Sequence, residues 1–179
     1  MTTRRPNIEN LRSLGNFTQA FRWVVEFTEL PSALSSYKGD GINFRAESTG
    51  IPKLNPQSSE VVIRGHKIKQ PGVGEYENTI TLTMVEFVDN YVSEFVRRWR
   101  ELCWETENGS TGLTHDKKDL EATMITTRLN NMDKPIWQYK FFGVFLETAE
   151  PGADLDASTS EPLKPALTLS FDYFNDKAL

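Results

Sequence analysis

The segment TITLTM, residues 79–84, alternates strictly between a threonine and an apolar residue. Successive side chains of a β-strand point to opposite faces of the sheet, so the alternation predicts a strand with one apolar and one hydroxyl face. The apolar face needs a hydrophobic core. The hydroxyl face meets bulk water, a neighbouring chain or a channel, and this choice largely determines the function. The apolar face holds Ile80, Leu82 and Met84; the hydroxyl face holds Thr79, Thr81 and Thr83.

Composition limits the class of protein. The 179 residues are 38% hydrophobic and 11% aromatic, which suits a single globular domain. The net charge of −5 opposes binding to nucleic acid through phosphate contacts, although it suits a surface past which nucleic acid slides. The single cysteine, Cys103, excludes an intrachain disulfide and indicates assembly in a reducing compartment.

The beginning of the chain, MTTRRPNIENLRSLGNF, has basic residues without the apolar stretch of a signal peptide. No apolar run approaches the roughly 20 residues that span a bilayer. We therefore expect a soluble protein made in the cytoplasm, with no membrane partner. Residues 1–16 are predicted to form an N-terminal arm and residues 17–179 a single domain.

The remaining pattern predicts a mainly β fold. One helix is expected at Asn90–Trp104, capped by Asp89 or Asn90, with a wide apolar stripe. Two polar stretches, Ser48–Ser59 and Glu105–Asp119, are expected to be irregular, and NNMDKP is expected to close a hairpin. About seven antiparallel strands and this helix favour a β-sandwich or small barrel. Further strands are predicted at Phe21–Phe27, Ile42–Glu47, Glu60–Gln70 (with a bulge at Gly65), Glu121–Leu129, Pro135–Glu147 and Pro165–Phe174.

Residues for catalysis or metal binding do not form a recognisable set. Gly72 and Gly74 lack the further residues and the helix of a phosphate-binding loop. Cys103 lies on the apolar stripe of the predicted helix, and His66 and His115 have no neighbours at metal-ligand spacing. We therefore predict no enzyme activity, no cofactor and no metal. A monomeric β-barrel that binds a small ligand between its threonine and aromatic faces remains an alternative.

Several motifs, in order, resemble the tail tube proteins of contractile-tailed bacteriophages. The segment KIKQPGVGEYENTITLTM resembles their central segment, with its glycine turn, aromatic–acidic pair and threonine-rich strand. FVRRW is similar to part of the family's helix, and YKFFGVFLETAEPGADLD followed by LTLSFDYF to its closing strands. The resemblance extends over residues 17–174. It departs from the family after Phe145, where a proline is expected and Leu146-Glu147 stands.

The resemblance implies a protomer that forms hexameric rings, whose strands join edge to edge into one continuous inner barrel. Stacked rings would form a hollow tube that conducts DNA during ejection, in a virion tail assembled in the host cytoplasm. Implied partners are the sheath, the baseplate hub or initiator, the tail terminator and the tape-measure protein. Type VI secretion tubes share this fold, so a secretion tube or a non-polymerising initiator ring at the baseplate are alternatives.

Within such a tube, three groups of residues are predicted to make the contacts. Thr79, Thr81 and Thr83 are candidates to face the lumen. Contacts between rings or with the sheath are expected from Ser48, Lys53, Asn55, Gln57, Ser110, Thr111, His115 and Lys117. The helix is expected at the subunit boundary through Arg97, Arg100 and Trp104.

Overall fold

The computed structural model describes residues 8–104, 115–150, 158 and 160–179. The mainly β prediction is confirmed in that part of the chain. The strands are β1 (Trp23–Glu29), β2 (Ala46–Thr49), β3 (Leu54–Ile63), β4 (His66–Tyr76), β5 (Thr79–Met84), β6 (Ala122–Leu129), β7 (Pro135–Glu150), β8 (Ala166–Ser170) and β9 (Tyr173–Ala178). The helices are α1 (Ile8–Arg12), the 3-10 helix η1 (Ser32–Tyr37), α2 (Asp40–Asn43), α3 (Tyr91–Cys103) and α4 (Lys117–Leu120).

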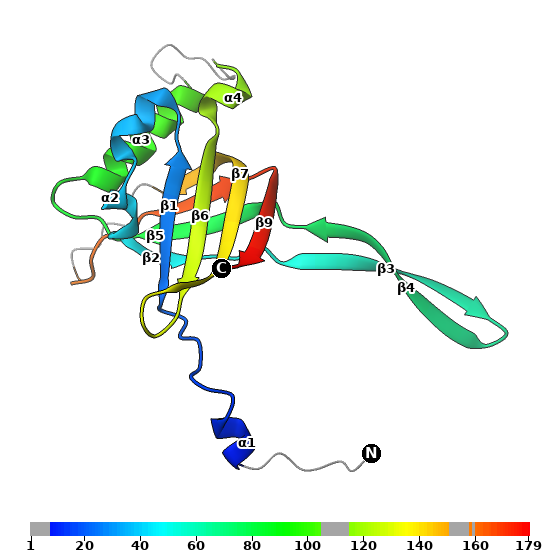
Figure 1. Ribbon diagram of the computed structural model, residues 1–179. Helices are drawn as coiled ribbons and strands as arrows, with labels where there is room; N and C mark the ends of the chain where they lie inside the picture. The colour runs from blue at the N-terminus through cyan, green and yellow to red at the C-terminus, as the bar shows by residue number, and fades with distance from the viewer. Residues whose placement is uncertain (1–7, 105–114, 151–157, 159) are drawn as a thin grey trace.

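The body of the protein is one antiparallel sheet folded into two layers. Its strand order is β1-β6-β7-β8-β5-β2, and β9 pairs with β7. β7 is 16 residues long and belongs to both layers: its first part pairs with β6 and β9, and its second part with β8. Figure 1 shows the layers crossing, with α3 and α4 near one end.

The fold between the layers occurs at Gly143 of β7. This glycine has φ +64°, and a Cβ atom there would collide with the side chain of Asp172. Opposite this point the partner strand also breaks, because Phe171 and Asp172 donate their backbone N–H groups to Asn78 and Phe142. The single strand predicted at Pro165–Phe174 is therefore wrong: it is two strands, β8 and β9, in different layers.

The core lies between the layers and beneath α3. The apolar face of β5 is buried, as predicted, and Leu82 and Met84 have no exposed surface. On α3, the buried Trp99 donates its indole N–H to the carbonyl of Leu120 at 3.1 Å, which joins the helix to α4. Phe27 packs edge-on against Trp99 with ring centroids 5.8 Å apart.

The first turn of α3 is capped mainly by a residue that sequence reasoning missed. Asn90 occupies the N-cap position in a left-handed conformation and makes no side-chain cap hydrogen bond. Instead, the carboxylate of Glu86 accepts hydrogen bonds from the backbone N–H groups of Val92 and Ser93 and from the Ser93 hydroxyl. Asp89 accepts the N–H of Tyr91 at 3.3 Å, so the predicted contribution of Asp89 is present.

Two other predictions are wrong in detail. The strand predicted at Ile42–Glu47 begins as helix α2, and only its end belongs to β2. The helical turn places the side chain of Asn43 where its Oδ1 accepts the N–H of Val25 at 3.0 Å, so α2 covers part of the outer edge of β1.

The strand predicted at Glu60–Gln70 is instead a hairpin. Ile63 pairs with His66 across a two-residue turn in which Arg64 and Gly65 both have positive φ, as a type I′ turn requires. The same hairpin takes in much of the predicted irregular segment Ser48–Ser59, whose first two residues belong to β2. Strands β3 and β4 form a separate two-stranded sheet that projects away from the body (Figure 1).

Candidate assembly surfaces

The outer face of β5 is a hydroxyl-rich surface without charge. Thr81 is exposed, and Thr79 and Thr83 are half-buried. Cross-strand partners on β8 extend the surface with two more hydroxyl groups and a methyl group. The register pairs are Thr79 with Ser170, Thr81 with Thr168, and Thr83 with Ala166. Uncharged hydroxyl groups are hydrated and suit strands, but they offer no cation to hold a phosphate.

The layer that carries this face is open at both ends. β2 pairs with β5, and no second strand pairs with it within the described residues. From Phe145 to Glu150, β7 pairs with β8, whereas its pairing with β6 stops at Val144. Unpaired strand edges expose N–H and C=O groups that favour pairing with another chain. This four-stranded layer can therefore be extended at either end.

The β3–β4 hairpin has two different faces. Opposed residues in an antiparallel pair share a face, so Val61 and Ile68 lie together with Ile63. These apolar residues are about half exposed. The opposite face is charged, because Lys67 and Lys69 lie 2.6 and 3.9 Å from carboxylate oxygens of Glu60. The apolar residues of this segment can be recognised from the sequence. The sequence does not reveal that the body of the protein leaves them exposed.

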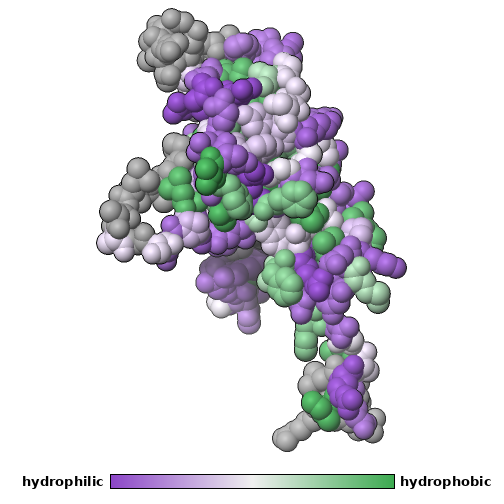
Figure 2. Space-filling view, turned by 90° about the vertical axis from the view of Figure 1, so that its left-hand side faces the viewer, coloured by the Kyte–Doolittle hydropathy of each residue, from purple (hydrophilic) through white to green (hydrophobic). Residues whose placement is uncertain are grey.

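A further apolar patch lies on the body. Phe44 and Phe87 are more than half exposed, and Val88 is 98% exposed. They flank Arg45, whose guanidinium lies 5.4 Å from the ring centroid of Phe87 and forms an ion pair with Asp89. Figure 2 shows hydrophobic side chains among hydrophilic ones on the side of the molecule that includes α2 and the loop before α3.

The three residues of the helix that are predicted to lie at the boundary between subunits differ in their surroundings. Arg97 is exposed and bonded to Glu94 and Glu101 on its own helix. These bonds, with those of Arg98, lower the pKa of Glu94 to about 2; hydrogen bonding to Arg97 is the largest cause. Arg100 is half-buried.

Trp104 lies at the end of α3 beside a small apolar cavity of about 300 Å³, which Cys103, Leu120 and Phe145 also line. Burial raises the pKa of the Cys103 thiol, which disfavours the reactive thiolate. An inert role for this cysteine, as expected from its position on the stripe, follows from the burial.

The predicted contact-loop residues are not brought together. Ser48 is exposed on β2 opposite Thr83, and Lys53 is exposed before β3. Asn55 and Gln57 belong to β3, where Gln57 is exposed. His115 precedes α4, and Lys117 on α4 forms an ion pair with Asp172 at 2.5 Å. Ser110 and Thr111 lie outside the described residues.

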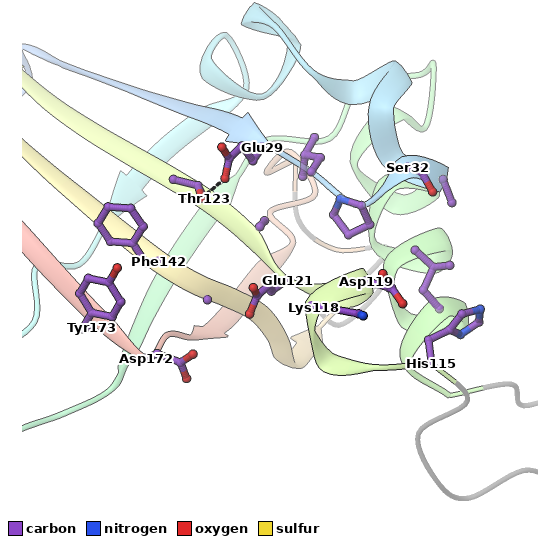
Figure 3. A pocket seen from close by; sticks show the side chains of 16 residues that line it. Glu29, Ser32, His115, Lys118, Asp119, Glu121, Thr123, Phe142, Asp172 and Tyr173 are labelled. Carbon is purple, nitrogen blue, oxygen red and sulfur yellow. Dashed lines mark hydrogen bonds between the residues drawn. The ribbon is translucent and has the colours of Figure 1, made fainter.

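A cavity of about 750 Å³ lies beside α4 and is lined by both polar and apolar residues. Figure 3 shows its side chains coming from the end of β1, from α4 and from β7 and β9. Two of its acidic groups are separately engaged: Glu29 accepts a hydrogen bond from Thr123 at 2.8 Å, and Asp172 is bound by Lys117. Among the residues described, no three His, Cys, Asp or Glu side chains are grouped to hold a metal ion.

No helix in the described ranges is long and apolar enough to cross a membrane.

Comparison with solved structures identifies the fold. The chain is similar to a chain in the sheath–tube complex of the extracellular contractile injection system PVC, with a TM-score of 0.62, 13% identity, and coverage of 98% of this chain and 100% of that one. It is also similar to a chain of the anti-feeding prophage baseplate (TM-score 0.64, 12% identity, 91% and 97% coverage). A third match is the SPP1 tail tube (TM-score 0.54, 10% identity, 91% and 80% coverage).

These similarities define the class of fold as that of tube proteins from phage tails and contractile injection systems. The resemblance noted in the sequence is thereby confirmed at the level of the fold. No protein-family model matches the sequence, and no curated protein matches it. At identities of 10–13%, the similarity concerns the backbone arrangement and leaves the function to be argued from the surfaces.

Proposed function

We propose that this chain is a structural subunit of a tail or injection tube, in which six copies form a ring and rings stack into a hollow tube. The observation that carries the proposal is the layer β2-β5-β8-β7, open at both ends and hydroxyl-rich on its outer face. Edge-to-edge pairing between copies satisfies the free backbone groups, and a closed ring leaves no edge to aggregate. An open-ended linear array would lack this advantage.

In the proposed ring, the outer face of β5 and β8 lines the lumen. Thr79, Thr81 and Thr83 would then present hydroxyl groups to a passing polymer without a cation to hold it. DNA is the cargo that this surface suits, because a polyanion meets neither fixed positive charge nor a broad apolar surface on these two strands. The sheath and baseplate components are the expected partners outside and below the tube.

Stacking of rings is assigned to the β3–β4 hairpin. No described element of the chain covers its apolar face, and its exposed valine and isoleucine side chains gain by burial against another copy. The segment predicted as a contact loop, Ser48–Ser59, thus contributes through a strand of this hairpin.

The proposal is tested by sedimentation velocity and negative-stain imaging of the purified protein over a range of concentrations. We expect rings or hollow rods to form as concentration rises. A monodisperse monomer at high concentration would contradict the proposal and favour the monomeric ligand-binding barrel. That barrel is disfavoured here because Trp99, Phe95 and Phe141 fill the space between the layers.

The stacking step has a matched pair of variants. Ile63→Lys places a charge on the apolar face of the hairpin, whereas Val62→Lys places it on the charged face, and the two wild-type side chains are similarly exposed at 55% and 64%. We expect I63K to give rings without rods and V62K to give rods. Equal rod formation by both variants would remove the hairpin from the stacking contact.

A single-ring role is the second candidate. The similarity to a chain of the anti-feeding prophage baseplate is as high as that to the sheath–tube complex, which favours testing an initiator directly. An initiator is expected to stop at one ring at every concentration. Rods from the purified chain alone would exclude this alternative.

A further inference from the structure

The gap between β1 and β2 is bordered by polar groups that have no hydrogen-bond partner among the described residues. Two adjoining cavities of about 470 and 350 Å³ follow the start of β1 and the end of β2, and Trp23 and Thr49 line both. We define these two cavities as the seam. It separates the two end strands of the folded sheet, each of which pairs with one other strand within the described residues.

One wall of the seam holds buried donor groups. Thr126 on β6 is 3% exposed, lines the smaller cavity, and its hydroxyl has no hydrogen-bond partner. Two positions along the same face, Arg128 also lines this cavity, and its buried Nε has no partner. Behind this wall, Trp137 lies opposite Arg128 in the register and has a buried indole N–H without a hydrogen-bond partner.

Aromatic rings hold the guanidinium of Arg128 in place. Its central carbon lies 5.6 Å from the ring centroids of both Trp137 and Tyr139. Within the described residues, no carboxylate forms an ion pair with Arg128, although Arg22 nearby is paired with Asp133. The group is therefore positioned by packing and lacks a counter-charge.

The chemistry of these groups specifies the missing partner. A guanidinium and an indole N–H are donors only, so what they lack is an acceptor. Buried polar groups are normally paired, so the buried Nε of Arg128 and the buried indole N–H of Trp137 each gain by meeting an acceptor. A carboxylate accepts from several donors at once and also neutralises the arginine, which a water molecule does not.

We propose that a carboxylate from a second copy of this chain enters the seam and binds Arg128, with Thr126 and Trp137 as further donors. This inference rests on the proposed assembly, because the seam borders the outer edge of β2, where a neighbour is expected. The chain has 25 acidic residues against 20 basic ones, so a neighbouring copy is a rich source of carboxylates. The single chain holds one half of the site and the neighbour supplies the other.

The first test measures, by sedimentation velocity, the concentration at which rings form, and compares this concentration between the wild type and two variants. Arg128→Met keeps a long side chain on the aromatic rings but removes the charge, and we expect it to raise this concentration at least about tenfold. Lys140→Met, which removes a cation from the other face of the same sheet, is the matched control and is expected to leave it unchanged. Ring formation by R128M at the wild-type concentration would overturn the inference while leaving the proposed function intact.

Thr126→Val is expected to affect assembly and folding stability differently. Removing a buried hydroxyl that has no partner in the single chain is expected to leave the thermal midpoint unchanged or raised, yet to weaken ring formation. A raised midpoint with normal ring formation would show that the hydroxyl has no partner in the assembly either, and would remove Thr126 from the site.

The second test detects the carboxylate itself. Arg128→Lys supplies an amine that a carbodiimide can join to a contacting carboxylate, and mixing isotopically light and heavy copies distinguishes links between chains from links within one. We expect a mixed-isotope peptide linked at position 128. Arg22→Lys, beside Asp133 of its own chain, is expected to give a single-isotope link. Assembled R128K without a link between copies would overturn the proposal, and wild-type protein that never assembles would overturn it together with the proposed function.

Discussion

Strand β5 and the β3–β4 hairpin each have an apolar face, but the two faces have opposite surroundings. In β5, Ile80, Leu82 and Met84 are buried between the layers. In the hairpin, Val61 and Ile63 also share one face of their strand, yet both are about half exposed. The difference is what lies above each apolar face: α3 and the opposite layer cover β5, and no element of the described chain covers the hairpin (Figure 1).

The comparison shows that an apolar strand face has two physical uses. Against the chain's own elements it stabilises the fold, and against another copy it stabilises an assembly. Residues of the hairpin do not contribute to the core cluster, so their apolar area adds little to the stability of the single chain. Mutations in the two regions should therefore affect different measurements.

The largest effect is expected from Leu82→Ala in β5. Truncating a fully buried leucine removes its transfer free energy and leaves a cavity, which lowers the free energy of unfolding by about 2–5 kcal/mol. Urea unfolding measures this loss. Thr81→Ala, on the exposed face of the same strand, is the control and is expected to change stability by about 0.5 kcal/mol or less. A cost for T81A as large as for L82A would show that the threonine face is packed in the single chain.

An intermediate effect on stability is expected from replacing two glycines with positive φ, one in the hairpin and one in the body. Gly65 in the hairpin turn has φ +83° and open space around it, so Gly65→Ala strains the backbone by about 1 kcal/mol. We expect faster hydrogen exchange of the hairpin amides with an unchanged global midpoint. Gly143→Ala, which also collides with Asp172 in the body, is expected to lower the global midpoint. An equal fall in the midpoint for both variants would mean that the hairpin unfolds with the body.

The smallest effect on stability is expected from replacing Glu94, which lies on the exposed face of α3. The pKa of Glu94 is lowered from 4.5 to about 2, first by its hydrogen bonds to Arg97 and then by those to Arg98. A lowered carboxylate pKa contributes stability that is present above pH 4.5 and is lost as the pH falls towards 2. The midpoint difference between wild type and Glu94→Gln should thus be constant above pH 4.5 and shrink as the pH falls from 4.5 towards 2. It should be small throughout because the site is exposed. A difference independent of pH would contradict this origin.

Much of the body could be predicted from local patterns. The period of two in β5 and the apolar stripe of α3 each specify which face is buried, and both predictions are confirmed. NNMDKP was expected to close a hairpin, and it does: Asn130 and Lys134 are joined by a backbone hydrogen bond of 2.8 Å. These predictions are confirmed because the residues that determine each feature lie close together in the sequence.

Errors arose where distant residues decide the local structure. Asn43 lies in a helical turn that reaches the edge of β1, and α3 receives its main cap from Glu86, seven residues before Ser93. Arg64 adopts a positive φ that its residue type does not favour, so the turn was mistaken for a bulge. Which faces line a lumen, and the roles of the predicted contact residues, remain predictions.

By itself, the sequence determined that β5 has one apolar and one hydroxyl face and that α3 has one buried stripe, since side-chain direction follows from backbone periodicity. Only the tertiary structure decided that the hairpin stands clear of the body. It also decided that, within the described part of the chain, both ends of one layer remain unpaired and Arg128 lies among aromatic rings without a counter-charge. The reason is that burial and pairing depend on which segments meet in space, and those contacts join residues far apart along the chain.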